Sequence, residues 1–286
     1  MDDSKVQDQV RQFYDRVGWQ MVAGGVYQNA RYEDLRPVSH EYIHRCHLRV
    51  NRHIQPNGRF LLDAGSGPVQ YPEYLTYSQG YHKRVCLDIS SVALQEARQR
   101  LGDHGLYVVA DVANLPFAAD VFDGIVSLHT LHHLPAGQQK MGYFELYRVL
   151  GRQRQAVVVN GWTDSPLMRL ASGPVRWMEA LGKRLARRKA AQAEPAPAAR
   201  EAPRVAKPTG TYIQKLDARL LQEQIGGSIA YEIFVWRSVN VRFLRAMIHA
   251  PLAGKFWLRL LYWLEERFPH YFGKQGQYPL VVLRKP

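Results

Sequence analysis

The chain has 286 residues, of which 46% are hydrophobic and 22% are charged, and this is enough for one substantial core with an appended region. Its two cysteines, Cys46 and Cys86, offer neither a disulfide framework nor zinc-ligand spacing, so no metal site is predicted. No apolar stretch approaches the roughly 18 residues of a membrane span, and the polar N-terminus differs from a signal peptide. The sequence therefore predicts a cytoplasmic protein, with or without peripheral contact to a membrane.

The formal net charge is +13, and its distribution limits what it indicates about partners. Between residues 183 and 207, eight lysines and arginines stand against two glutamates, which gives +6 and leaves +7 elsewhere. The segment 190–208 is almost entirely Ala, Pro, Glu, Arg and Lys, so it is predicted to be a disordered or loosely helical linker. A basic tract can bind nucleic acid or anionic lipid, but a solvated linker is the favoured interpretation.

Residues 4–55 are predicted to be mainly helical, because Val6, Val10, Phe13 and Val17 recur at helical spacing. The segment 60–68, FLLDAGSGP, then reads as an apolar strand that ends at an aspartate and turns through two glycines. Glycine permits backbone angles and close approaches that a Cβ forbids. Such a turn between a strand and a helix typically forms a nucleotide-binding cradle at the carboxyl end of a parallel sheet.

Three further apolar runs with polar ends follow, at residues 85–90, 107–112 and 122–129. Asp88 lies 21 residues after Gly67 (88 minus 67), a spacing that suits the two hydroxyls of a ribose. Helical patterns separate the runs, so they predict βαβ units on one parallel sheet. An aspartate at a strand end is also a common helix cap or turn residue, and Asp111 taken alone fits that interpretation equally well.

Together these segments, from about residue 60 to residue 160, resemble class I S-adenosylmethionine (SAM)-dependent methyltransferases of the branch that includes quinone C-methyltransferases. Residues 111–117, DVANLPF, followed by DVFD at 120–123, are similar to a signature of that family. The resemblance implies a Rossmann-like, doubly wound α/β sheet of seven strands with the last strand antiparallel. It implies SAM as the cofactor, with contacts from Asp63, Gly65, Ser66, Gly67, Asp88, Ile89, Asp111, Val112 and Leu128.

Three features depart from the family pattern. Val69 stands where many members have a third glycine, and Gln70 is not glycine either, so the dinucleotide motif G-x-G-x-x-G is absent and a nicotinamide enzyme is disfavoured. Residues 151–155, GRQRQ, replace the usual Lys-Pro-Gly-Gly turn before the fifth strand, which is predicted at 156–162.

The chain is predicted to comprise a helical cap (1–57), a SAM-binding core (58–162), a helix with the linker (163–210) and the C-terminal part of the core (211–286). In the last part we predict a helix at 211–225 and strands at 228–237 and 278–283. About 40 residues separate these two strands, so an insertion is predicted at about 238–277.

The insertion contains an amphipathic helix, predicted at 252–268. Its apolar stripe comprises Phe256, Trp257, Leu260, Leu261, Leu264 and Phe268, and its other side comprises Lys255, Arg259, Tyr262 and Glu266. Packing of the stripe on the domain is the favoured interpretation. A lid over an apolar acceptor and a membrane-surface helix are the alternatives.

Three histidines, His129, His132 and His133, follow the fourth strand on the face where open α/β sheets bind ligands. Imidazole titrates near neutrality and suits a general base, although many methyltransferases need none. His133 is the first candidate because it lies furthest along the loop. Asn160 and Trp162 are candidate acceptor contacts, and Tyr14 and Tyr27 are candidate pocket residues or ordinary core aromatics.

The predicted function is methyl transfer from SAM to a small acceptor that is apolar or lipid-linked, with possible peripheral contact to anionic membrane. Abundant aromatic residues and the amphipathic insertion favour such an acceptor. The alternative is a methyltransferase that binds or modifies RNA through its basic segment, suggested by the isoelectric point of 9.8, although no RNA-binding module is present. A degenerate fold kept as a scaffold is the third interpretation, disfavoured by the intact aspartates.

Overall fold

The computed structural model describes residues 3–19, 21–22, 26–27, 33–192 and 211–286. Most of the predicted linker at 190–208 lies outside these residues, and its first three residues continue a long helix. The side chain of Tyr27 also lies outside the described part. Within the described residues, no helix is both long and apolar enough to cross a membrane.

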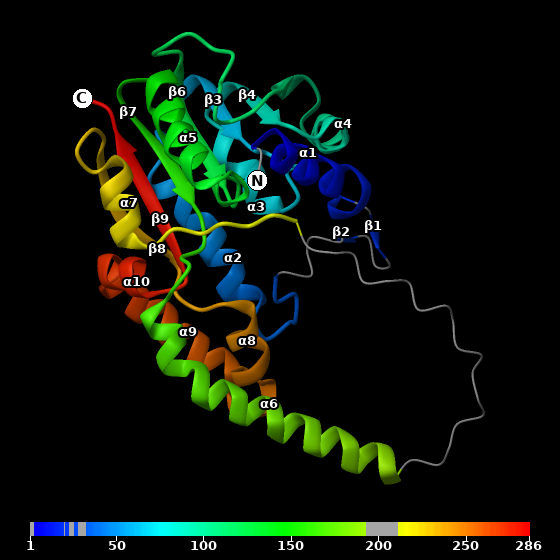
Figure 1. Cartoon of the computed structure of the whole chain (residues 1–286). Helices are drawn as coiled ribbons and strands as arrows, with labels where there is room; N and C mark the ends of the chain where they lie inside the picture. The colour runs from blue at the N-terminus through cyan, green and yellow to red at the C-terminus, as the bar shows by residue number, and fades with distance from the viewer. Residues whose placement is uncertain (1–2, 20, 23–25, 28–32, 193–210) are drawn as a thin grey trace.

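A seven-stranded sheet forms the centre of the molecule, in the order β5-β4-β3-β6-β7-β9-β8 (Figure 1). Strand β9 runs antiparallel to both of its neighbours, and the other pairs are parallel, which confirms the predicted Rossmann-like fold. The strands are β3 (Gly58–Ala64), β4 (Tyr81–Asp88), β5 (Gly105–Val109), β6 (Phe122–Leu128), β7 (Leu150–Val159), β8 (Ala230–Arg237) and β9 (Tyr278–Arg284).

The central strands are apolar along their length because both faces of the sheet are covered. Helices α5 (Ala136–Val149) and α7 (Ala218–Ile225) pack on one face through Leu146 and Leu221. Helices α3 (Pro72–Leu75) and α4 (Ser91–Leu101) pack on the other face. The carboxyl ends of the parallel strands therefore remain as the edge at which a ligand can enter.

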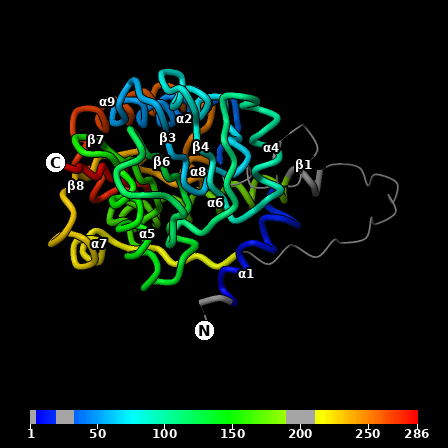
Figure 2. The backbone as a smooth tube through the Cα atoms, turned by 90° about the horizontal axis from the view of Figure 1, so that it is seen from above, coloured from blue at the N-terminus to red at the C-terminus, as the bar shows by residue number. Residues whose placement is uncertain are grey.

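The N-terminal segment is less helical than predicted. Helix α1 (Asp3–Phe13) continues as a short π-helix at Tyr14–Gly18, and α2 (His40–Leu48) follows after a gap. Between them lie two short strands, β1 (Met21–Val22) and β2 (Val26–Tyr27), which pair as an antiparallel ribbon. Figure 2 shows α1 at the side of the sheet next to α4.

Two further boundaries differ from the prediction. Strand β7 begins at Leu150, so residues 151–155 belong to the strand rather than to a turn. Helix α7 begins only at Ala218, where Asp217 caps it by accepting a hydrogen bond from the Leu220 N–H. Residues 211–217 are extended instead, because their backbone bonds to other loops: the Gln214 N–H donates to the His132 carbonyl and the Thr163 N–H to the Leu216 carbonyl.

The predicted insertion between β8 and β9 is present and contains three α-helices, α8 (Val241–Met247), α9 (Gly254–Arg267) and α10 (Pro269–Gln275), with a short 3-10 turn between α8 and α9. Helix α9 packs in the opposite orientation to the one predicted. Leu258, Tyr262 and Glu265 face the core, whereas Trp257 is 53% exposed and Trp263 is 59% exposed.

A buried carboxylate determines this orientation of α9. Glu265 is fully buried and accepts hydrogen bonds from the Tyr42 hydroxyl (2.7 Å), from Arg49 Nη1 (2.9 Å) and from the Ser238 N–H (2.9 Å). A buried charge needs such partners, and once they are provided the helix cannot turn its apolar stripe inward. Most of the stripe, including Phe256, Trp257 and Leu260, is therefore exposed, while Leu261 at its margin still packs against the apolar cluster of α2 and α8.

Helix α6 (Pro166–Gln192) is the other prominent surface element and extends away from the sheet along the lower side of Figure 1. Met168 of α6 and Leu258 of α9 pack in the same small apolar cluster, together with residues of α2 and α8. The molecule thus has a second, helical layer at the side of the sheet that carries β8 and β9.

Candidate functional site

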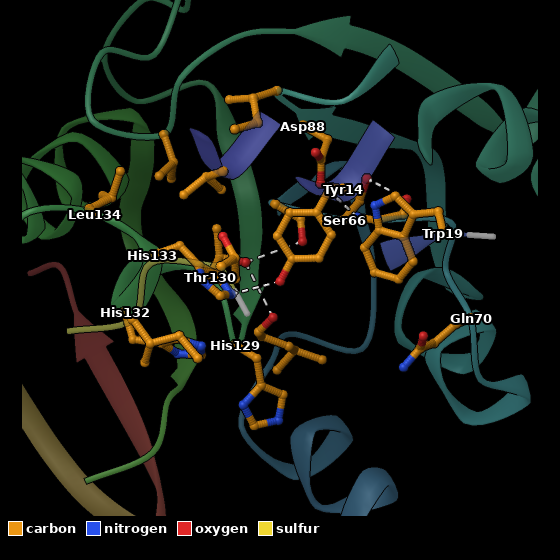
Figure 3. A pocket seen from close by; sticks show the side chains of 18 of the residues that line it. Tyr14, Trp19, Ser66, Gln70, Asp88, His129, Thr130, His132, His133 and Leu134 are labelled. Atoms are coloured by element: carbon orange, nitrogen blue, oxygen red, sulfur yellow. Dashed lines mark hydrogen bonds between the residues drawn. The ribbon is translucent and has the colours of Figure 1, made fainter. Parts of the chain in front are cut away.

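A cavity of about 320 Å³ lies at the carboxyl ends of the parallel strands, where α1 and the π-helix cover it (Figure 3). One part, the glycine half, is formed by the ends of β3, β4 and β5 and includes Gly65, Gly67, Asp88 and Asp111. The other part, the histidine half, is formed by residues next to β6, β7, β8 and β9 and includes His129, His133, Lys215, Arg237 and Tyr278.

The turn after β3 depends on glycine at two positions. Gly65 has φ 74° and Gly67 has φ 53°, both in the left-handed region that side chains rarely adopt. A Cβ on Gly65 would lie 2.2 Å from the Thr130 side chain, and a Cβ on Gly67 would lie 2.9 Å from the Trp19 ring. The turn can therefore approach these groups, and a ligand between them, only without side chains of its own.

Val69 also has a left-handed backbone, with φ 52°, although it is a buried, β-branched residue. A left-handed conformation costs an L-residue roughly 1–2 kcal/mol. The geometry explains physically why a glycine is the usual residue at this position in the family that the sequence resembles. The turn keeps the same shape here, at the expense of local strain.

Asp88 ends β4 and is held by two backbone donors. Its Oδ2 accepts the Gly67 N–H at 2.9 Å, and its Oδ1 accepts the Ser90 N–H at 2.9 Å. Burial raises the pKa of Asp88 to about 6, and these two hydrogen bonds counter only part of that effect. The remaining lone pairs of the carboxylate suit the hydroxyl donors of a ribose.

Asp111 lies at the far end of the glycine half, and α1 reaches it directly. The Gln7 side-chain amide donates to Asp111 Oδ2 at 2.6 Å, and the Ala113 N–H donates to Oδ1 at 2.9 Å. The helical cap is thus attached to the same aspartate that the sequence assigns to the cofactor. Sequence reasoning missed Gln7, which carries no local signal.

Eight of the nine predicted cofactor residues line this cavity: Gly65, Ser66, Gly67, Asp88, Ile89, Asp111, Val112 and Leu128. Asp63 does not line it. Its carboxylate is buried in an ion pair with Arg84 of β4, which bonds to it through Nε (3.1 Å) and Nη2. The structure therefore assigns Asp63 to holding β3 against β4 behind the turn, rather than to the cavity wall.

His133, the first candidate for a base, lines the histidine half and pairs with Tyr14. Its Nδ1 is 2.8 Å from the Tyr212 carbonyl, which can only accept, so Nδ1 carries the proton and Nε2 is free to accept. The Tyr14 hydroxyl lies 2.7 Å from Nε2 and donates to it (Figure 3). Burial lowers the pKa of His133 to about 4, so the ring is neutral near pH 7.

The other predicted residues of this region have different roles. His129 lines the cavity with φ 58°, and burial together with the charge of Arg237 lowers the pKa of its ring to about 3. His132 also lines it and contacts Asn160 Oδ1 through Nδ1 at 3.0 Å. Asn160 therefore supports a histidine, while Trp162 is buried in the core and donates to the Gly273 carbonyl.

Three charged residues of the histidine half were not predicted. Arg237, at the end of β8, is buried and paired with Glu33. Burial alone would raise the pKa of Glu33, but Arg237 and a hydrogen bond with His47 outweigh it and lower that pKa to about 2. Lys215 comes from the extended segment 211–217. An arginine next to the apolar run of β8 is the one sequence signal that points to a buried charge here.

Comparison with known proteins identifies the domain. Residues 62–156 match the family model of a methyltransferase domain. The chain carries a class I SAM-dependent methyltransferase domain. The match covers the glycine turn and Asp88, Asp111 and the three histidines. No curated protein sequence matches the chain.

Solved structures agree in fold. Phosphoethanolamine N-methyltransferase 1 of Haemonchus contortus, in complex with phosphoethanolamine and S-adenosylhomocysteine (SAH), superposes with a TM-score of 0.59 at 8% identity, over 100% of this chain and 50% of that chain. Geranyl diphosphate C-methyltransferase of Streptomyces coelicolor A3(2) gives 0.53 at 12% identity, over 98% of each chain. The [4+2]-cyclase SpnF gives 0.51 at 16% identity, over 98% of this chain and 97% of that chain. At these identities the likeness shows the fold alone.

The glycine half of this methyltransferase domain fits SAM on its own geometry. Two glycines leave room that a Cβ would fill, and two strand-end carboxylates, Asp88 and Asp111, lie on the same wall of the cavity. Among the described residues, no group of three or more His, Cys, Asp and Glu side chains is arranged to hold a metal ion.

Proposed function

We propose that the protein transfers the methyl group of SAM to a small acceptor with an apolar body, bound in the histidine half of the cavity. The observation that carries this proposal is the continuity of one cavity from the glycine turn to the histidine loop. A cofactor held by one half and an acceptor held by the other would meet between Gly65 and His133. Alignment of two reactants in this way can lower a barrier by up to about 7–11 kcal/mol.

In this proposal Asp88 holds the ribose hydroxyls, Asp111 lies at the adenine end, and the Gly65–Gly67 turn passes beneath the methionine part. When bound, SAM supplies an activated methyl group on a sulfonium. The protein's own contribution is to position the acceptor and to exclude water, and the Tyr14 and Trp19 rings, which stack at 5.1 Å between centroids, cover the turn.

We propose His133 as the group that accepts a proton from a hydroxyl or amine acceptor. Its Nε2 carries a lone pair that faces the cavity, and the Tyr14 hydroxyl can pass a proton to it or be displaced by the acceptor. Because burial makes a charged imidazole costly, the ring stays available as a neutral acceptor of hydrogen bonds. His132 is the weaker candidate, since Asn160 already occupies its Nδ1.

Calorimetry with SAH and a transfer assay with methyl-labelled SAM test the proposed function. We expect micromolar or tighter binding of SAH and label in an organic-extractable product when a panel of amphiphilic alcohols, amines and quinols is supplied. His133→Gln should lower turnover and leave SAH affinity unchanged, and His82→Gln, the same change at an exposed histidine of β4 outside the cavity, is the matched control. No SAH binding would refute the proposal, and label found in RNA alone would favour the RNA-modifying alternative.

We further propose that α6 and α9 contact an anionic membrane surface. Helix α6 carries an outward stripe of Leu170, Trp177, Leu181 and Leu185, in which Leu170 is 81% exposed and Trp177 is 66% exposed. Helix α9 adds Phe256, Trp257, Leu260 and Trp263. These faces are apolar, rich in tryptophan and uncovered by any described residue, which is typical of interfacial helices.

The charge of α6 selects anionic lipid as the occupant. Residues 166–188 contain six lysines and arginines against one acid, Glu179, which Arg242 already pairs. Each cation near an anionic surface contributes about 1 kcal/mol. The predicted lid role of α9 has no support in this geometry, since no residue of α9 lines the cavity.

Vesicle flotation tests the membrane proposal. The protein should float with vesicles that contain 30% phosphatidylglycerol, at least about tenfold more than with pure phosphatidylcholine, and added salt should reduce the difference. The double substitution Trp177→Ser and Trp257→Ser should abolish flotation, whereas Met141→Ser, an exposed apolar residue of α5, should not. Equal and negligible flotation with both kinds of vesicle would remove this part of the proposal.

A further inference from the structure

Among the described residues, the histidine half of the cavity contains a cation, Lys215, that has no counterion. Lys215 lies on the extended segment 211–217, whose backbone is fixed on both sides of it: the Gln214 N–H donates to the His132 carbonyl at 2.7 Å and the Thr163 N–H to the Leu216 carbonyl at 2.8 Å. The Thr163 hydroxyl also donates to the Lys215 carbonyl at 2.5 Å. The position of this lysine is therefore set by the fold rather than by a mobile loop.

The Lys215 side chain runs beside Gly161, at the end of β7. Its Nζ and its Cε each lie 3.2 Å from the place that a Cβ on Gly161 would occupy. It is partly buried, it lines the cavity, and burial lowers its pKa. Within the described residues, no carboxylate lies within 4 Å of its Nζ and no acceptor bonds to it, which distinguishes it from the paired charges nearby.

Arg237 strengthens the positive character of the same region. One of its terminal nitrogens pairs with Glu33, yet its buried Nε has no hydrogen-bond partner in the part of the chain that the structure describes. Arg237 and Lys215 both lie close enough to His129 to oppose protonation of that ring. Arg237 and Lys215 thus lie near a single carboxylate, Glu33, which pairs with Arg237. The positive charge of Lys215 is therefore not neutralised by a described residue.

A partly desolvated ammonium without a partner is unfavourable, and an anionic ligand restores the lost interactions. The described residues offer no such anion, whereas a bound ligand can bring one. We infer that the acceptor carries an anionic group, a carboxylate or a phosphate, which pairs with Lys215 while its apolar body occupies the rest of the histidine half. This inference rests on the proposed function, because it assigns the ligand of the same site.

The competing source of an anion is the carboxylate of the cofactor's own methionine part. Lys215 lies beside Gly161 at the end of β7, whereas the glycine turn follows β3, and β6 lies between these two strands in the sheet. The geometry favours the acceptor, and the experiment separates the two sources.

Calorimetry on the full chain saturated with SAH provides the test, with decanoate, decyl phosphate and decanol as probes below their critical micelle concentrations. Wild type should bind one or both anionic probes about 10- to 150-fold more tightly than decanol, the range for a hydrogen bond to a charged group. Lys215→Met should abolish that preference, and Lys215→Arg should retain most of it. Lys140→Met, which removes an exposed lysine of α5, should behave as wild type.

Three results would overturn the inference. The first is equal affinity of wild type for decanol and both anionic probes. The second is retention of the preference in Lys215→Met, or in Lys215→Gln if the methionine variant does not fold. The third is a loss of SAH affinity in Lys215→Met without a loss for 5′-methylthioadenosine, which lacks the carboxylate, because Lys215 would then hold the cofactor. Failure of wild type to bind SAH at all would refute the proposed function instead, and it is measured first.

Discussion

The protonation state of Asp88 should control cofactor binding. In the free protein its pKa is about 6, because burial disfavours the carboxylate more than the two backbone N–H donors stabilise it. Ribose hydroxyls that donate to this group stabilise its ionised form more than its protonated form. SAH should therefore bind more tightly as pH rises through about 6, and Asp88→Asn should remove this dependence.

The magnitude follows from the strength of a hydrogen bond to a charged group, about 1.5–3 kcal/mol. At 1.36 kcal/mol per pKa unit, that interaction lowers the pKa of Asp88 in the complex by about 1–2 units. Kd for SAH at pH 5 should then be about five- to tenfold weaker than at pH 7. At pH 7 the Asp88→Asn variant should bind SAH about 10- to 150-fold more weakly than wild type.

The sign of the effect on folding is also defined. Since the pKa of Asp88 is raised from 3.8 to about 6, its contribution to stability is fully present below pH 3.8 and is lost as pH rises through about 6. Because SAH binds more tightly at pH 7 than at pH 5, it should also raise the melting temperature more at pH 7. Calorimetry at pH 5, 6 and 7 in two buffers of different ionisation enthalpy measures both Kd and proton release. A pH-independent Kd for wild type, or an equal slope in Asp88→Asn, would refute this reasoning.

Three further predictions follow from the geometry. Gly67→Ala should destabilise the fold by about 1–3 kcal/mol and weaken SAH binding, because the new Cβ meets the Trp19 ring. Gly102 also has a positive φ, but a Cβ there would have no atom within 4 Å. Gly102→Ala should therefore lower the melting temperature and leave the SAH affinity measured by calorimetry unchanged. Glu265→Ala should lower the free energy of unfolding by about 1–3 kcal/mol in urea titrations, because Tyr42 and Ser238 lose their buried acceptor and Arg49 keeps Glu266 as its one carboxylate partner. A loss below about 1 kcal/mol would contradict the anchoring of α9. The ¹⁵N-NMR signals of His133 should show a neutral, Nδ1-protonated ring that titrates with a pKa of about 4. Because this pKa is lowered from 6.5, the contribution of His133 to stability should be lost as pH falls from 6.5 toward 4. A titration near pH 6.5 would contradict the burial of the ring.

Most of the glycine half could be predicted from the sequence because its signals are local. A strand, its terminal aspartate and the glycines that follow are adjacent in the chain, and parallel strands bring such ends together at one edge. Asp63 shows the limit of this reasoning. Its carboxylate belongs to the same motif, but Arg84 of the neighbouring strand draws it into the sheet, and a strand-end pattern does not reveal which face a side chain takes.

The errors in the C-terminal part have a different origin. Residues 211–217 have a helical pattern, but hydrogen bonds to the loops at His132 and Thr163 hold them extended, and this places Lys215 in the cavity. Likewise, the broadest apolar stripe of α9 faces outward because Glu265 pairs with Arg49, more than 200 residues away in sequence. In both cases a distant partner outweighs the local pattern, and periodicity cannot reveal such a partner.

The position of β9 in the sheet has a consequence for synthesis of the chain. Strand β8 pairs only with β9 within the described sheet, and β9 also completes the open edge of β7. The ribosome therefore has to add the three helices of the insertion, about 40 residues, before either edge is covered, which takes roughly 2–8 s at 5–20 residues per second. During that interval two apolar strand edges are open to pairing with other chains. Slowed translation of residues 238–277 would lengthen this exposure without changing a single contact of the finished protein.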